Sequence, residues 1–336
     1  MTSIAEMRLT RKAHELFPGL LTAVTIAFAA KFISEHYGAP VMLMALLIGM
    51  AFNFLAEDGG QCVPGIELAS KTLLRFGVGL LGLGITVQQM METGSTMLLI
   101  TVSGVVLTIF AGLAFSRVLG RKTRFGLLTG GAVAICGASA ALAIASVLPR
   151  SKELERDTVF TVIAVTALST LAMILYPIIA TRVGFSDIAT GVFLGATIHD
   201  VAQVVGAGYS VSDLAGETAT FIKLLRVALL VPLVVLLSIL FRTREDTSAS
   251  RLPIPFFVLG FSAMVAVNSM DILPAALSQA LLDLARWCLV IAISALGMKT
   301  SLSKLRDVGG KSVFLVCALT VLLAAFALIS IKVTMA

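Results

Sequence analysis

Residues 194–208 read LGATIHDVAQVVGAG and place His199, Asp200 and Gln203 within five positions of a very apolar chain. A polar or ionisable side chain at membrane depth is expensive, so it usually faces the inside of a helix bundle and has a function. The flanking glycines indicate backbone that departs from a plain helix, which a membrane tolerates only inside protein or beside a cavity. We therefore interpret this stretch as half of a substrate site.

The composition around this stretch is that of a membrane protein. Of 336 residues, 58% are hydrophobic and 13% are charged, whereas a soluble domain carries about 25% charged residues. The chain divides into about eleven apolar segments, most of them long enough to cross a bilayer as a helix. We predict an all-α polytopic membrane protein without a soluble domain.

Charges and cysteines narrow the functional classes. The net charge of +6 comes largely from basic residues in short loops, where they set membrane topology, so it does not indicate nucleic acid. The first 16 residues are too polar for the apolar region of a signal peptide. The cysteines match neither a disulfide framework nor a metal site, so we expect no metal and no cofactor. They are Cys62, Cys136, Cys288 and Cys317.

Two pairs of similar stretches indicate an internal repeat. LGIT at 83–86 resembles LGMK at 296–299, and an apolar helix is expected after each. GAVAICG at 131–137 resembles GATIHD at 195–200, with one gap. We predict a first repeat over residues 39–181 and a second, reordered repeat over residues 187–333.

The direction of these stretches discriminates between two topologies. If all eleven segments crossed the membrane, 83–86 and 296–299 would lie in oppositely directed helices, whereas 131–137 and 195–200 would run in the same direction. A single inverted repeat cannot contain both relations. If both glycine-rich stretches re-enter from opposite sides, every pair is inverted and the basic loops share the cytoplasmic side. These loops are 117–124, 150–156, 242–251 and 299–311. We favour about nine spanning helices, two re-entrant or broken helices and a cytoplasmic N-terminus; eleven spanning helices are the alternative.

Interrupted helices in an inverted repeat are typical of secondary transporters, in which half-helix N-termini face anionic groups near the membrane midplane. Small residues let an anion approach the backbone N–H groups at such a helix start. The first glycine-rich stretch offers Gly130, Gly131, Gly137, Ala138 and Ser139. We predict an anion site here, with close helix packing through small residues as the alternative.

Polar side chains predict further substrate contacts. His199 and Asp200 suggest a proton relay, because histidine titrates near neutral pH; alternatively, one of them only caps the helix break. Gln203 lies four residues after His199 and can share its face. Lys223 and Arg226 also share a helix face and could bind an anion, or extend to the membrane interface.

Five stretches together resemble the YeiH-type family of bacterial inner-membrane proteins, which are candidate sulfate exporters. They are GIT at 84–86, ICGASA at 135–140, GATIHDVAQVV at 195–205, KLLR at 223–226 and ALGMKT at 295–300. The resemblance covers nearly the whole chain, implies a multi-pass inner-membrane protein, and includes Cys136 among the site residues. The family usually has Glu after the histidine, so Asp200 carries the charge on a shorter arm. A broader resemblance is to bile-acid and sodium symporters, on 83–86 and 166–171, but no acidic pair typical of a sodium site accompanies it.

We therefore expect a secondary carrier that exports a small inorganic anion, sulfate or sulfite, with proton coupling through His199. The alternatives are a carrier for an organic anion, such as a sulfonate or a carboxylate, and an anion channel, although no ring of like residues marks a filter. An enzyme is not expected, because Cys136 and His199 are not accompanied by a HExxH, GxSxG or paired-carboxylate motif. The expected partners are a small anion and the lipid bilayer; the coupling ion and a homodimeric state stay open.

Overall fold

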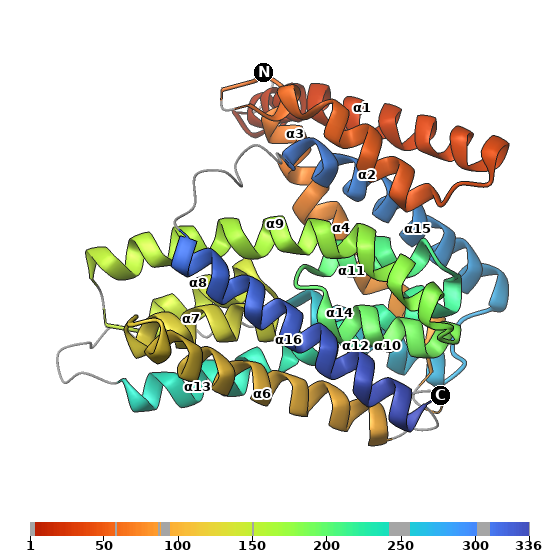
Figure 1. Cartoon of the computed structure of the whole chain (residues 1–336). Coiled ribbons are helices and arrows are strands. Elements are labelled where there is room, and N and C mark those ends of the chain that lie inside the picture. The colour runs from red at the N-terminus through yellow and green to blue at the C-terminus, as the bar shows by residue number, and fades with distance from the viewer. Residues whose placement is uncertain are drawn as a thin grey trace. The chain divides into compact units, whose positions relative to one another are not determined.

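The computed structural model describes residues 4–57, 59–86, 88, 95–149, 151–241, 256–300 and 310–335, and each regular element in them is a helix (Figure 1). Among these described residues, six helices are long and apolar enough to cross a membrane: His14–Tyr37, Ser95–Val118, Lys152–Val183, Asp213–Leu240, Ala275–Lys299 and Ser312–Thr334. This confirms the prediction of an all-α polytopic membrane protein. The predicted cytoplasmic loop 242–251, and most of 299–311, lie outside the described residues.

The chain divides into two compact units, and each draws on both predicted repeats. The first unit contains residues 1–87 and 259–301. Its helices are α1 (Ile4–Tyr37), α2 (Val41–Ala51), η1 (Asn53–Ala56), α3 (Val63–Leu68), η2 (Ala69–Leu73), α4 (Leu74–Leu80), η3 (Leu81–Gly84), most of α14 (Phe256–Ser269), and α15 (Ala275–Lys299). The repeats themselves remain a prediction.

Close packing through glycine joins the helices of the first unit. A Cβ added to Gly65 on α3 would lie 2.2 Å from the Leu16 carbonyl oxygen on α1, and one on Gly49 would lie 2.4 Å from the Ser294 carbonyl oxygen on α15. Glycine therefore lets these backbones touch. The third apolar segment begins earlier than its apolar run at residue 73 suggests, because Pro64 starts α3 and a π-helical turn continues it into α4.

The second unit contains residues 88–258 and 302–336 and holds the glycine-rich stretches. Its helices are α6 (Ser95–Val118), α7 (Thr123–Ala134), α8 (Ala138–Val147), α9 (Lys152–Val183), α10 (Asp187–Thr197), α11 (Val201–Tyr209), α12 (Asp213–Ala228), α13 (Leu230–Leu240) and α16 (Gly310–Thr334). Part of its apolar core forms where α7, α8, α9 and α16 meet, around Leu128, Val133, Ile144, Val165 and Leu319, which are fully buried.

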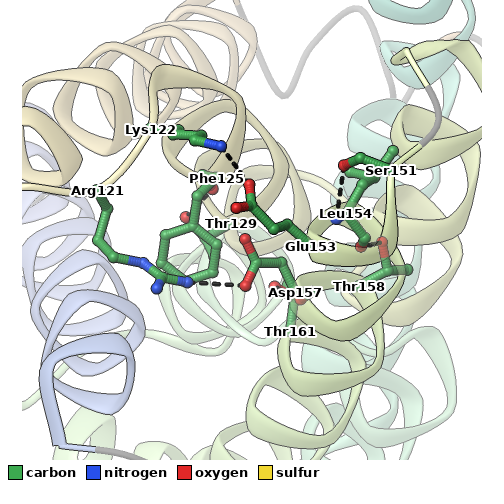
Figure 2. Close-up of polar contacts among 10 residues, drawn as sticks. All are labelled: Arg121, Lys122, Phe125, Thr129, Ser151, Glu153, Leu154, Asp157, Thr158 and Thr161. Carbon is green, nitrogen blue, oxygen red and sulfur yellow. Dashed lines mark hydrogen bonds and ion pairs between the residues drawn. The ribbon is translucent and has the colours of Figure 1, made fainter.

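Helices α7 and α8 form a hairpin. Figure 2 shows that the start of α7 is tied to the start of α9, because Arg121 pairs with Asp157 at 2.7 Å and Lys122 pairs with Glu153. The C-terminus of α8 therefore lies on the same side of the second unit as the N-terminus of α7. Side-by-side packing agrees: a Cβ on Gly131 of α7 would lie 2.3 Å from Cδ1 of Ile144 on α8.

Helices α10 and α11 form a second hairpin, at the opposite end of the long helix α9. A Cβ on Gly191 of α10 would lie 2.8 Å from the Ala215 carbonyl oxygen, and one on Gly208 of α11 would lie 3.0 Å from the same oxygen. Along α12, Gly195 faces Ala219, one turn further than Ala215. Helix α10 thus runs parallel to α12, and the C-terminal end of α11 lies beside the start of α12.

Candidate functional site at two helix breaks

The tips of the two hairpins lie against each other. Each tip is a short break, between Ala134 and Ala138 in the first hairpin and between Thr197 and Val201 in the second. Gly137 has φ +63° and ψ −120°, a backbone conformation that is essentially restricted to glycine. A Cβ at this position would also lie 3.4 Å from the Cβ of His199. The predicted site residue Gly137 thus forms the first break and contacts the second.

Arg226 on α12 is 1% exposed, and all five N–H donors of its guanidinium go to main-chain carbonyl oxygens. Nε donates to Ala134 at 2.9 Å, and Nη2 donates to Ala134 at 2.7 Å and to Val133 at 3.0 Å. Nη1 donates to Gly195 at 2.9 Å and to Ile198 at 3.1 Å. No donor is left for an anion, which corrects the predicted substrate contact; burial equally corrects the alternative, extension to the membrane interface.

Lys223 lies three residues before Arg226 and is also fully buried. Its Nζ donates to the carbonyl oxygen of Ile135 at 2.6 Å and to that of Ile198 at 2.8 Å, one from each break. An ammonium has three donors, so one N–H has no partner among the described residues. An anion contact therefore stays available to Lys223, whereas the alternative of an interfacial side chain is wrong.

The electrostatic reason for this arrangement is the way the two helices end. The last carbonyls of α7 and α10 have no partner within their own helix, and each helix end carries about half a negative charge. Buried carbonyls without hydrogen bonds are costly. Lys223 and Arg226 supply the missing donors and the opposite charge, so α12 holds both breaks together.

His199 is fully buried, and both of its ring nitrogens have partners. Nδ1 lies 3.1 Å from the carbonyl oxygen of Val133, which can only accept, so Nδ1 carries a hydrogen. Nε2 lies 3.1 Å from the Thr320 hydroxyl, which is also 2.9 Å from the Val316 carbonyl oxygen. Because a hydroxyl has one hydrogen, Thr320 either donates to a neutral ring or accepts from a protonated ring and donates to Val316. This geometry accommodates both protonation states.

Asp200 caps the second break, as the alternative interpretation had it. Its carboxylate accepts from the backbone N–H of Ala202 at 2.8 Å and of Gln203 at 3.4 Å, and its own N–H donates to the Ser169 hydroxyl at 3.0 Å. Gln203 is buried; Nε2 donates to the Thr170 hydroxyl at 2.9 Å, and Oε1 has no hydrogen-bond partner in the described part of the chain. Gln203 therefore keeps an open acceptor beside the break.

The residues of the first glycine-rich stretch, 130–139, have two different roles. Gly130 packs against the backbone of α6 and Gly131 against Ile144, so both have the packing role, which corrects their predicted contact with an anion. Ala138 and Ser139 form the first turn of α8, whose N-terminus no side chain caps, and Ser139 is exposed. The start of α8 therefore keeps the features of an anion site, and Cys136 is buried just before it.

Sequence reasoning assigned no contact to three residues that complete the polar site, although Ser169 and Thr170 lie in the stretch 166–171 of the broader resemblance. They are hydroxyl side chains inside apolar helices: Ser169 and Thr170 on α9, and Thr320 on α16. Such side chains commonly bond to the carbonyl four residues earlier, as Thr320 and Thr170 also do. Local sequence therefore gave no signal for their contacts with the break.

The family model described as "Conserved hypothetical protein 698" matches residues 18–316. Relatives named UPF0324 membrane proteins match along nearly the whole chain. The protein belongs to the UPF0324 family. This membership confirms the YeiH-type resemblance of the sequence motifs, and UPF0324 relatives are named as membrane proteins; the broader likeness to bile-acid and sodium symporters stays a prediction.

Three UPF0324 relatives show how far this similarity extends. A protein of Chlorobaculum tepidum is 55% identical over 94% of this chain and 89% of its own length. A protein of Paracoccus denitrificans named TauZ is 52% identical over 94% and 95% of the two chains. A more distant protein of Bacillus cereus is 32% identical over 90% of each chain.

Proposed function

We propose that this UPF0324 protein is a secondary carrier that exports a small inorganic anion, sulfate or sulfite, across the bacterial inner membrane. The observation that carries the proposal is the pair of fully buried cations, Lys223 and Arg226, hydrogen-bonded to main-chain carbonyls at two facing helix breaks. Opposed broken helices near the midplane are the usual setting of a carrier site.

The charge balance at the breaks favours an anion. Lys223 and Arg226 contribute two positive charges when both are protonated, and the carbonyls accept from them at N–H···O distances of 2.6 to 3.1 Å. Helix ends contribute about half a charge each, and the C-terminal ends of α7 and α10 offset the N-terminal ends of α8 and α11. After the carboxylate of Asp200 is counted, about one positive charge remains. A small anion would neutralise it.

The start of α8 is the position for that anion. Backbone N–H groups and the helix dipole favour negative charge there, and Ala138 and Ser139 are small enough for close approach. Asp200 already caps α11, whereas α8 has no side-chain cap. The free N–H of Lys223 and the open acceptor of Gln203 are further contacts for an oxyanion, the latter when the oxyanion carries a proton.

For the membrane topology, we propose nine spanning segments and two re-entrant hairpins. The hairpins are α7–α8 and α10–α11, since each leaves and returns at one end of the second unit. The basic loop 117–124 and the start of α9 lie together (Figure 2) and would be cytoplasmic under the positive-inside rule. Counting back along α6, α3–α4, α2 and α1 places the N-terminus in the cytoplasm.

A carrier accounts for the polar residues better than an enzyme. The ring nitrogens of His199 are engaged by Val133 and Thr320, so neither is positioned as a base for Cys136. Protonation of His199 can instead accompany anion binding, because a nearby anion favours the charged ring.

Flux into proteoliposomes tests the proposal. Purified protein should take up labelled sulfate or sulfite with saturating kinetics, under an imposed pH gradient, above the level of empty liposomes. Sulfonates and carboxylates are the competitors: stronger inhibition by these than by unlabelled sulfate and sulfite would replace the inorganic substrate by an organic anion. Flux without saturation would indicate a channel. No flux of any of these anions would refute the proposal.

A charge variant locates the anion. Ser139→Asp adds a carboxylate in the first turn of α8, where it stabilises the helix by about 0.3–1 kcal/mol but repels an anion. The matched control is Ser146→Asp in the last turn of the same helix. Anion affinity should fall at least tenfold in Ser139→Asp and change little in Ser146→Asp. Equal effects of the two substitutions would exclude the start of α8 as the site.

A further inference from the structure

The ammonium of Lys223 occupies a position built for a cation. Its two oxygen partners are the carbonyls of Ile135 and Ile198, which come from different helix breaks more than sixty residues apart in sequence. In carriers with broken helices, carbonyls at such ends are the ligands that coordinate Na⁺ or a proton. Here a side chain of the protein itself already fills that position.

We propose that Lys223 is a tethered cation in a main-chain site for a monovalent cation, and that the carrier therefore needs no Na⁺ at its helix breaks. Arg226 donates to the other carbonyls of both breaks, those of Val133, Ala134 and Gly195, and shares the Ile198 carbonyl with Lys223. Removal of the Lys223 side chain would leave the Ile135 oxygen without a side-chain donor and the Ile198 oxygen with Arg226 alone, both facing a buried space. Such a space should accept an external cation of matching length.

Among the described residues, no group of three or more His, Cys, Asp or Glu side chains could hold a metal ion. Asp200, two residues after Ile198, uses one carboxylate oxygen to cap α11. The positive charge that the breaks require is supplied by Lys223 and Arg226, at the cost of burying two cations.

Chemical rescue of Lys223→Ala tests the proposal. Alanine retains Cβ, so the missing atoms are three carbons and the nitrogen of n-propylammonium. Thermal unfolding of the purified variant in detergent, followed by helical circular dichroism, is measured with methyl-, ethyl-, propyl- and pentylammonium and with NaCl. The melting temperature should be lower than in the wild type, and it should rise with the logarithm of propylammonium concentration above the dissociation constant.

Three controls separate cation binding from a general effect of amines. The first is n-propanol, which has the same length and no charge. The second is Lys223→Met, whose side chain fills the space, so propylammonium should not rescue it. The third is Lys122→Ala, because the side chain of Lys122 is 73% exposed and its loss creates no buried site.

The outcomes decide between the alternatives. Rescue that is strongest with propylammonium and absent with propanol supports a cation site. A folded Lys223→Ala variant that no amine and no Na⁺ stabilises would overturn it. Wild-type stability is measured in NaCl and in choline chloride: equal melting temperatures are expected, and specific stabilisation by Na⁺ would refute the replacement of the ion, even if the variant cannot be purified. The statement that the carrier needs no Na⁺ rests on the proposed carrier function. All measurements here are of thermal stability, so their failure can be distinguished from a failure of sulfate flux.

Discussion

The substitution Arg226→Met tests whether Arg226 braces the two helix breaks or binds the substrate. Methionine retains an apolar stem but removes five hydrogen bonds to four carbonyl oxygens. Two of these oxygens keep another donor, since Val133 is bonded by His199 and Ile198 by Lys223. The carbonyls of Ala134 and Gly195 lose their side-chain donors.

Each newly unpaired buried carbonyl costs about 1–3 kcal/mol, so the free energy of unfolding should fall by about 2–6 kcal/mol. For a folded unit of about 150–250 residues, the size range of the second unit, a loss of 1 kcal/mol lowers the melting temperature by about 2–4 °C. The expected decrease is therefore about 4–24 °C. Arg226→Lys keeps the charge and three of five donors, so its melting temperature should lie between those of the wild type and Arg226→Met.

A fluorogenic thiol dye can follow this unfolding, because the chain has free cysteines and two of them, Cys136 and Cys288, are buried in the folded state. The control is Lys122→Met, which removes an exposed ion pair worth at most about 1 kcal/mol. If Arg226→Met melts within about 2 °C of the wild type and loses anion binding, Arg226 contacts the substrate and the hydrogen-bond argument is wrong.

Three further predictions follow from the breaks. Apparent anion affinity should fall as pH rises, since a bound anion favours protonated His199 and this linkage is reciprocal; His199→Gln should flatten the dependence, and parallel curves would make His199 structural. Gly137→Ala should destabilise the protein by about 1–3 kcal/mol. The control, Gly184→Ala, should destabilise it less, because Gly184 lies in the left-handed region (φ +80°, ψ +30°) and an added Cβ would meet nothing within 4 Å. Thermal unfolding of the two variants compares these effects. In a background without native cysteines, a cysteine at Ser151 should react only from the cytoplasm and one at Ser212 only from outside; external labelling of Ser151 would restore eleven crossings.

Several features of the fold could be predicted from sequence because they depend on local composition. Apolar runs of bilayer length predict the spanning helices, whereas the orientation that the basic loops indicate stays a prediction. The helix breaks are also local, since Gly137 supplies a positive φ that other residues avoid, and Asp200 supplies a helix cap. His199 is recognised as exceptional because of the cost of placing an ionisable side chain in so apolar a stretch.

The tertiary structure alone decided the partners of the buried polar groups. Lys223 and Arg226 carry the same charge whether they face an anion, a carbonyl or the lipid interface; only the convergence of α7, α10 and α12 shows that carbonyls hold them. The same convergence reserved Gly130 and Gly131 for packing and brought Thr320 to His199 across 121 residues. A hydrogen bond depends on which atoms meet in space. A sequence determines how costly a buried charge or carbonyl is, but the packed bundle determines which group satisfies it.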